Sequence, residues 1–238
     1  EDLYDKLYKV GYHDSNICHT VGLFKYIGLA LEQKVLISTA YSIKDSKKCP
    51  KLVSRNIFNV INYFKAILQS KKKSVRIKIL DVGCSHGLAV KILREYGFEA
   101  YGIDVAPTAI DLCTKRYNLK TCKLGSATAI PFQDNFFDVI ISSDTIEHIL
   151  PVDVNLMANE FYRVTKKSCL LAIAQDPESN KTHLNMAKEK YESLQNVETL
   201  HTCLKTTDEW NSLFKKAGFQ RIQKICDENF LYQFILRK

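Results

Sequence analysis

The residues best suited to chemistry begin with the stretch KILDVGCSHG at 78–87. An apolar run that carries Asp81 leads into a turn bracketed by Gly83 and Gly87, and a helical pattern follows. Glycine lets the backbone approach a ligand closely, and a helix after the turn directs its first N–H groups toward the same place. This order of strand, glycine turn and helix predicts a binding site for a nucleotide-type cofactor.

A second acid, Asp104, ends the next predicted strand, residues 99–103. A carboxylate in this place can accept hydrogen bonds from the two hydroxyls of a ribose. The GxGxxG dinucleotide fingerprint and the GxxxxGK[ST] phosphate-binding motif are both absent from the chain. The pattern therefore predicts a nucleoside cofactor and disfavours phosphoryl transfer.

A third polar cluster is the sequence DTIEH at 144–148. On a helix, Asp144, Glu147 and His148 would occupy positions i, i+3 and i+4 and share one face. Such a face could hold a divalent metal ion, or His148 could act alone as a general base, which is the favoured interpretation. His183 and His201, after the fifth predicted strand, could also face the substrate, although such residues are more often surface histidines.

Strands and helices alternate from residue 77 onward. The expected strands are 77–82, 99–103, 120–124, 137–142, 168–174, 219–226 and 229–236. The expected helices are 87–96, 107–117, 153–165 and 206–217. This alternation predicts an α/β fold, a Rossmann-like doubly wound sheet of seven mostly parallel strands with an antiparallel C-terminal strand. The last two strands are close enough to form a hairpin, and this pair is expected to be added at the edge of the sheet.

The residues before the glycine turn differ in character. Residues 1–52 are predicted to form a helical, aromatic-rich lid or substrate segment, and residues 53–238 the cofactor-binding domain, which starts with a helix over 53–70. Tyr4 and Tyr8 lie four residues apart, so they share a helix face. A simple packing helix is the alternative to a lid.

Charge is distributed unevenly along the chain. Residues 1–78 hold 15 Lys+Arg and 6 Asp+Glu, a net charge of +9, and the remaining 19 and 20 give −1, for a total of +8. The basic excess suits an anionic small molecule, a nucleic acid or a lipid surface, or it is only a solvated lysine-rich face. No apolar run reaches the roughly 18 residues of a transmembrane helix.

Eight cysteines are scattered through the sequence without a CxxC pair, so a zinc site is not expected. Several lie in apolar runs, which favours buried thiols in a reducing compartment. No signal-peptide pattern is visible. We therefore expect a soluble, cytoplasmic protein.

These motifs together resemble the class I S-adenosylmethionine-dependent methyltransferases, of the small-molecule type. Four stretches match the family pattern in order: LDVGCSHG at 80–87, YGIDVAPTAI at 101–110, GSATAIPFQDNFFDVIISSDTIEHI at 125–149 and NEFYRVTKKSCLLAIA at 159–174. TTDEWNSLFKKAGF at 206–219 resembles the penultimate helix of the family. The resemblance covers about residues 77–238 and implies S-adenosylmethionine as cofactor and S-adenosylhomocysteine as product.

The resemblance implies a role for each matching position. Asp81 and the turn would hold the methionine end, Asp104 the ribose, and Val105 the adenine. The full set of implied cofactor-binding residues is Asp81, Gly83, Cys84, Ser85, Gly87, Asp104, Val105, Ser126, Ala127 and Ser143. Ser85 stands where the family usually has Gly, and Ser126 where it usually has Asp, a stronger acceptor than a hydroxyl.

The DxxEH cluster is similar to the ExxEH metal motif of ubiquinone-pathway O-methyltransferases and of small-RNA 3′-terminal 2′-O-methyltransferases. Asp144 is one methylene shorter than the usual Glu, so a bound metal is not favoured and His148 is the expected catalytic residue. The predicted function is O-methylation of a small-molecule or lipid-like acceptor. The alternatives are an RNA 2′-O-methyltransferase that uses the DxxEH metal site, and a cofactor-binding pseudoenzyme.

Overall fold

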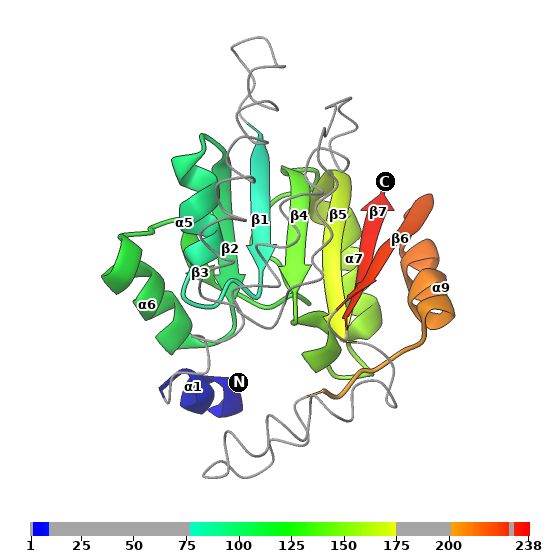
Figure 1. Cartoon of the computed structure of the whole chain (residues 1–238), viewed down its shortest axis with the longest axis horizontal. Coiled ribbons are helices and arrows are strands. Elements are labelled where there is room, and N and C mark those ends of the chain that lie inside the picture. The colour runs from blue at the N-terminus through cyan, green and yellow to red at the C-terminus, as the bar shows by residue number, and fades with distance from the viewer. Residues whose placement is uncertain (1, 10–76, 175–200, 229–230) are drawn as a thin grey trace.

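The structure is a computed structural model that describes residues 2–9, 77–174, 201–228 and 231–238 (Figure 1). Several sequence predictions fall outside these ranges. They are the helix over 53–70, most of the segment 1–52, nearly all of the basic residues before the glycine turn, and His183.

A mixed sheet forms the centre of the described chain (Figure 1). Its seven strands follow the order β3-β2-β1-β4-β5-β7-β6. Their bounds are β1 Lys78–Val82, β2 Glu99–Asp104, β3 Cys122–Leu124, β4 Phe137–Ser143, β5 Thr165–Ala174, β6 Arg221–Glu228 and β7 Leu231–Arg237. Neighbouring strands from β3 to β5 are parallel, and β7 is antiparallel to both of its neighbours. The predicted doubly wound α/β fold is confirmed.

The two C-terminal strands lie at one edge of the sheet, as predicted, and the later of the two takes the inner position. β7 lies between β5 and β6, and β6 is the edge strand. Side-chain burial explains the order: Phe234, Ile235 and Leu236 of β7 are fully buried, whereas Arg221 and Lys224 of β6 are exposed. The more apolar strand therefore takes the inner position, and the charged strand meets water.

Helices cover the sheet, and the four that follow the glycine turn agree with the sequence prediction within one residue at each end. Their bounds are α1 Asp2–Lys9, α5 Leu88–Glu95, α6 Pro107–Tyr117, α7 Val154–Val164 and α9 Thr207–Ala217. Pro107 starts α6, where its missing N–H costs no helical hydrogen bond. Thr206 and Glu209 form a capping box at the start of α9, and Gly218 ends it in the left-handed conformation. No helix in these ranges has the length and apolar character needed to span a membrane.

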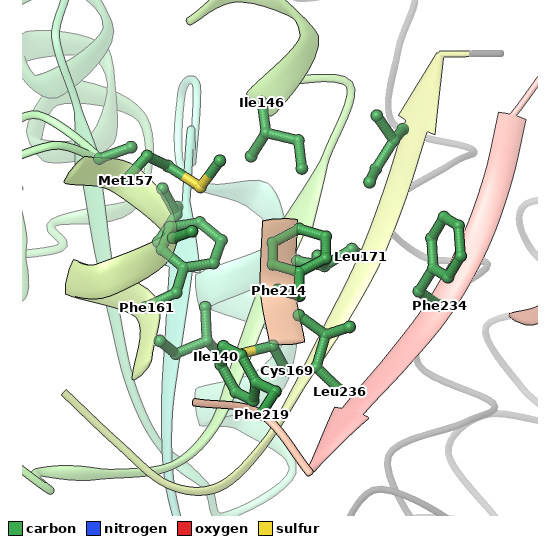
Figure 2. Packing of buried hydrophobic residues seen from close by; sticks show 14 of the residues in the cluster. Ile140, Ile146, Met157, Phe161, Cys169, Leu171, Phe214, Phe219, Phe234 and Leu236 are labelled. Atoms are coloured by element: carbon green, nitrogen blue, oxygen red, sulfur yellow. The ribbon is translucent and has the colours of Figure 1, made fainter. Parts of the chain in front are cut away.

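Most of the core that the structure describes has two parts, one on each face of the sheet. Ile79 belongs to the part that includes α5, whereas the next residue, Leu80, belongs to the part formed with α7 and α9. Figure 2 shows the second part, where Phe161 and Phe214 gather with Leu171 of β5. Because successive strand residues point to opposite faces, apolar strands such as β1 contribute to both parts.

One strand boundary differs from the prediction, and one apolar residue of α7 faces water. Leu156 is 54% exposed, whereas Met157 and Phe161 are fully buried. Residues 154, 157, 158 and 161 hold the helical spacing that faces the core, and position 156 falls outside it. β5 begins at Thr165, three residues earlier than predicted, because Thr165 already pairs with the start of β4.

Candidate active site

The carboxyl ends of β1, β2 and β4 form the candidate site. Val82 is paired with Ile103 on β2 and with Ser142 on β4, so the three strands end at the same level. The next residues along these strands are Gly83, Asp104 and Ser143. The strand order reverses between β1 and β4, and α/β sheets bind ligands at such a reversal, outside the carboxyl ends of the strands.

Backbone hydrogen bonds hold the glycine turn against β2. The N–H groups of Gly83 and Cys84 both donate to the carbonyl of Ile103, each at 2.9 Å. Gly83 has a φ of 77°, and a Cβ there would collide with the side chain of Thr145. Ser85 also adopts the left-handed conformation, with a φ of 51°. The turn therefore keeps its tight shape although a serine stands where the family usually has glycine.

Asp104 is the centre of a buried hydrogen-bond network. Its Oδ2 accepts from the Ser85 N–H at 2.9 Å and from the Tyr8 hydroxyl at 3.3 Å, and its Oδ1 accepts from the Ala106 N–H at 3.0 Å. Burial raises the pKa of Asp104, and these hydrogen bonds act in the opposite direction. Val105, the position implied for the adenine, is half-buried.

Helix α1 docks beside this network. The Asp5 carboxylate accepts from the Thr108 N–H at 2.9 Å, and so caps α6, whose N-cap residue Ala106 has no side-chain acceptor. Hydrogen bonds from Lys9 and Thr108 lower the pKa of Asp5 to about 2. Tyr8 packs against Ala106. The helix face that Tyr4 and Tyr8 are predicted to share thus contacts the site.

Asp81 is the second buried acid of the site. It is 3% exposed, and it pairs with Gly102 on β2, one strand away. Desolvation raises its pKa well above the ordinary value, and negative charge on Cys122 and Asp104 adds to the shift. A cation bound nearby would offset both effects.

The loop after β3 is tied to the same network. The Gly125 N–H donates to the backbone carbonyl of Asp104 at 2.9 Å. Ser126 Oγ accepts from the Thr128 N–H at 3.1 Å and lies 2.8 Å from the Thr128 hydroxyl, while Ala127 is buried. The implied adenine positions therefore lie next to Asp104, and the Ser126 hydroxyl already supports its own loop.

The predicted helical face of Asp144, Glu147 and His148 is wrong. Only Ile146–His148 is helical, as a single 3₁₀ turn. Asp144 precedes it with a φ of 48°, and its N–H donates to a carbonyl of β5 at 3.0 Å. The chain leaves β4 through this tight turn, and Pro151 disfavours continued helix in the residue before it, so no α-helical face forms.

His201 joins Glu147 and His148 instead of Asp144. One ligand atom from each of the three residues lies within 4.8 Å of the others, and the two imidazole rings are 4.7 Å apart between centroids. The Cys203 N–H donates to the Glu147 carbonyl at 2.9 Å and fixes the second segment there. Glu147 is fully buried, and both histidines are half-buried. Two imidazoles and one carboxylate suit a divalent transition metal, and one imidazole can serve as a base.

Helix α1 connects the two parts of the site. Tyr8 donates to Asp104, and the Tyr4 ring meets the His148 ring edge-on with centroids 5.4 Å apart. The sequence indicated His201 only as a residue that could face the substrate, because no local pattern reports a contact across more than 50 positions. Within the described residues, Tyr8 is a further polar contact of Asp104 that the motifs did not indicate.

Comparisons with known proteins agree with this arrangement. Residues 80–173 match the protein family described as "Methyltransferase domain". The chain is 31% identical over 102 residues to a ubiquinone biosynthesis O-methyltransferase of Bartonella tribocorum, covering 41% of this chain and 40% of that protein. It is 25% identical over 169 residues to a tRNA N(3)-cytidine methyltransferase of Gallus gallus, covering 65% and 46%. The chain thus spans less than half of the length of either relative.

Solved structures show the same fold. A Pyrococcus horikoshii protein superposes with a TM-score of 0.54 at 21% identity, covering 80% of this chain and 92% of that one. A Haemonchus contortus phosphoethanolamine N-methyltransferase, solved with S-adenosylhomocysteine, gives a TM-score of 0.51 at 20% identity, covering 78% and 47%. Residues 80–173 thus match a methyltransferase domain, and the sheet order and the glycine turn of the described chain agree with the resemblance to the class I S-adenosylmethionine-dependent methyltransferases.

Proposed function

We propose that the protein transfers the methyl group of S-adenosylmethionine to an oxygen atom of a small-molecule or lipid-like acceptor. One observation carries this proposal: the glycine turn, Asp104 and Ser143 meet at the carboxyl ends of β1, β2 and β4. Helix α1 contacts both Asp104, through Tyr8, and His148, through Tyr4. The similarity to a ubiquinone biosynthesis O-methyltransferase supports oxygen as the methylated atom.

The residues fit the cofactor in charge and shape. When bound, S-adenosylmethionine supplies an activated methyl group on a sulfonium ion. Asp81 is a buried acid with a raised pKa, and a nearby ammonium group would lower that pKa. Gly83 keeps the backbone open where a Cβ would not fit, and Asp104 offers a carboxylate to the ribose hydroxyls. These groups bind and orient, which is the main demand of an in-line transfer.

His148 is the residue we assign to the acceptor. A neutral imidazole can take the proton that an acceptor hydroxyl loses as its oxygen is methylated. Glu147 and His201 lie beside His148 and would either orient its ring or, with it, hold a divalent metal that binds the acceptor oxygen. We favour the metal-free base, because Asp144, the first residue of the DxxEH motif, does not join the other two in one cluster.

An RNA 2′-O-methyltransferase is the second candidate. The basic residues 1–78 and the similarity to a tRNA methyltransferase support it, as does the cluster of Glu147, His148 and His201. A mobility-shift assay with RNA at low and high salt separates the two candidates, since phosphate contacts give strongly salt-dependent binding. Absence of binding at low salt would exclude the RNA candidate.

Calorimetry with S-adenosylhomocysteine tests the cofactor assignment. Asp104→Asn should weaken binding by about 1.5–3 kcal/mol, the scale of a hydrogen bond to a charged group. Asp111→Asn is the matched control, because Asp111 is an exposed acid on α6. Equal affinities for the two variants would refute the role of Asp104, and no measurable binding by the unaltered chain would favour the pseudoenzyme.

Transfer assays test the assignment of His148. Acceptors are first found by thermal-shift screening in the presence of S-adenosylhomocysteine. His148→Ala should then lower the transfer rate by about 10²–10⁴-fold while cofactor affinity persists, as for loss of a general base. If a chelator leaves the unaltered enzyme active, the metal-free mechanism stands; if it abolishes activity and Mg²⁺ restores it, the metal alternative replaces it. Unchanged turnover by His148→Ala would contradict both mechanisms.

A further inference from the structure

Three cysteine side chains meet behind the glycine turn. Cys84 lies in the turn, Cys113 on α6 and Cys122 at the start of β3, and their sulfur atoms all lie within 4.8 Å of one another. All three are buried free thiols. We propose that they form a binding site for one thiophilic divalent ion, of the Zn²⁺ and Cd²⁺ class, directly beneath the cofactor turn.

Two glycines leave room for the sulfur atoms. A Cβ on Gly102 would lie 2.7 Å from the sulfur of Cys84 and 3.1 Å from that of Cys122. A Cβ on Gly87 would lie 2.8 Å from the sulfur of Cys113. Sulfur ligands about 2.3 Å from a tetrahedral zinc ion lie about 3.8 Å from each other, so the thiols can share an ion after small side-chain rotations.

A fourth donor is already present. The backbone carbonyl of Ser85 accepts from the thiol of Cys113 at 3.3 Å and from that of Cys84 at 3.7 Å. Once an ion replaces the thiol protons, this oxygen is free to complete a four-coordinate set of three sulfurs and one oxygen. Four ligands in a closed arrangement are typical of structural zinc sites.

A divalent ion leaves less negative charge buried among the three sulfurs than a monovalent ion would. Three thiolates and a divalent ion leave a net charge of −1, which the nearby guanidinium of Arg94 can balance. Hydrogen bonds from Cys113 and Cys84 lower the pKa of Cys122, and the charge of Arg94 acts in the same direction. Arg94 is itself held by a hydrogen bond to the Ala100 carbonyl at 3.2 Å. A monovalent ion would leave one more negative charge buried.

Ion binding would affect the cofactor turn. Cys84 and Ser85 belong to the turn, and their N–H groups bind the Ile103 carbonyl and the Asp104 carboxylate. An ion bound to the Cys84 sulfur and the Ser85 carbonyl would restrain these two residues from the side opposite to their N–H groups. S-adenosylhomocysteine should therefore bind more tightly to the ion-loaded protein.

Titration of the reduced full chain with Cd²⁺ under argon tests the site without any methyl acceptor. We expect an ultraviolet sulfur-to-cadmium charge-transfer band that saturates at one equivalent and is displaced by Zn²⁺. Cys113→Ala and Cys122→Ala should each weaken ion binding by at least about 100-fold. Loss of a residue that only supports the ligands usually weakens metal binding by about 10–100-fold. Cys169→Ser and His201→Ala are matched controls that should keep the band, because neither belongs to the cluster.

Several outcomes would overturn the proposal. They are no charge-transfer band in the unaltered chain, an unchanged band in both alanine variants, or loss of the band in the Cys169→Ser control. Ready disulfide formation within the cluster on treatment with diamide, without ion uptake by the reduced chain, would also overturn it. Circular dichroism shows whether each variant folds, and two independent variants keep the test decisive if one does not.

Discussion

Asp81 and Asp104 are two buried acids at the ends of adjacent parallel strands. Each is nearly inaccessible to water, and negative charge on Asp104 contributes to the raised pKa of Asp81. A carboxyl group whose pKa is higher in the folded state than the ordinary value of about 3.9 binds protons more readily after folding. It therefore destabilises the unliganded fold as the pH rises from that value through the raised pKa.

Cofactor binding should reverse this effect. Because the ammonium group of S-adenosylhomocysteine would lower the pKa of Asp81, binding should release protons and should tighten as the pH rises through the raised pKa. Calorimetry at several pH values, in buffers of different ionisation enthalpy, measures both quantities. Asp81→Asn should bind more weakly and lose most of the pH dependence. A pH-independent affinity of the unaltered protein would contradict the role of Asp81.

Ser85 shows that the turn uses backbone groups rather than side chains. Its N–H donates to Asp104 and its carbonyl accepts from two thiols, while its hydroxyl lies 3.2 Å from Nδ1 of His86. A residue in the left-handed conformation carries a strain of about 1–2 kcal/mol unless it is glycine. The surrounding hydrogen bonds offset that strain, which explains how the turn tolerates a serine.

At the scale of elements, α1 and α6 meet through a shared helix end. Asp5 of α1 supplies the side-chain acceptor that α6 lacks at its N-terminus, and Tyr8 reaches Asp104 from the same helix. The Tyr8 hydroxyl therefore occupies an oxygen of the carboxylate that is proposed to bind the ribose. A ribose hydroxyl would have to compete for Oδ2.

Tyr8→Phe should consequently strengthen the binding of S-adenosylhomocysteine. Removing the competing donor should gain about 0.5–1.5 kcal/mol, the net value of one hydrogen bond. Tyr101→Phe is the control, because its hydroxyl donates to Glu99 near the start of β2. Weaker binding by Tyr8→Phe would mean that the hydroxyl contacts the cofactor instead of competing with it.

Helix α9 depends on its capping box. The Thr206 hydroxyl accepts from the Glu209 N–H at 3.4 Å, and the Glu209 carboxylate accepts from the Thr206 N–H at 2.7 Å. Thr206→Ala should lower the free energy of unfolding by about 1 kcal/mol, measured by urea denaturation. Ser212→Ala, an exposed position in the middle of the same helix, should be neutral or slightly stabilising. Equal effects of the two substitutions would show that the cap contributes nothing.

At the scale of the whole molecule, the sheet connects the cofactor turn with a core on its other face. Trp210, the single tryptophan of the chain, is fully buried in that second part and lies 5.8 Å from Phe214 between ring centroids. The turn borders the first part through Cys84. The strands contribute side chains to both parts of the core, so unfolding of one part would expose the other part to water.

Saturation of the cofactor turn with S-adenosylhomocysteine should therefore also raise the temperature at which the core around Trp210 unfolds. A ligand at 100 times its Kd adds about 2.7 kcal/mol to the free energy of unfolding. For a chain of this size that corresponds to a rise in Tm of about 5–10 °C, followed by Trp210 fluorescence. Asp104→Asn should reduce the shift at the same ligand concentration. No shift with saturating ligand would indicate that the two parts unfold independently.

The sequence alone determined the elements and the family. Helical and strand periodicity, Pro107, Thr206 and the glycine turn act over a few residues, so local patterns located the four helices after the turn, the seven strands and the cofactor-type turn. Only the tertiary structure placed β7 inside the sheet, replaced Asp144 by His201 beside His148, and gathered Cys84, Cys113 and Cys122. These contacts join residues far apart in the chain, and they arise because packing and strand register, rather than local propensity, decide which distant side chains meet.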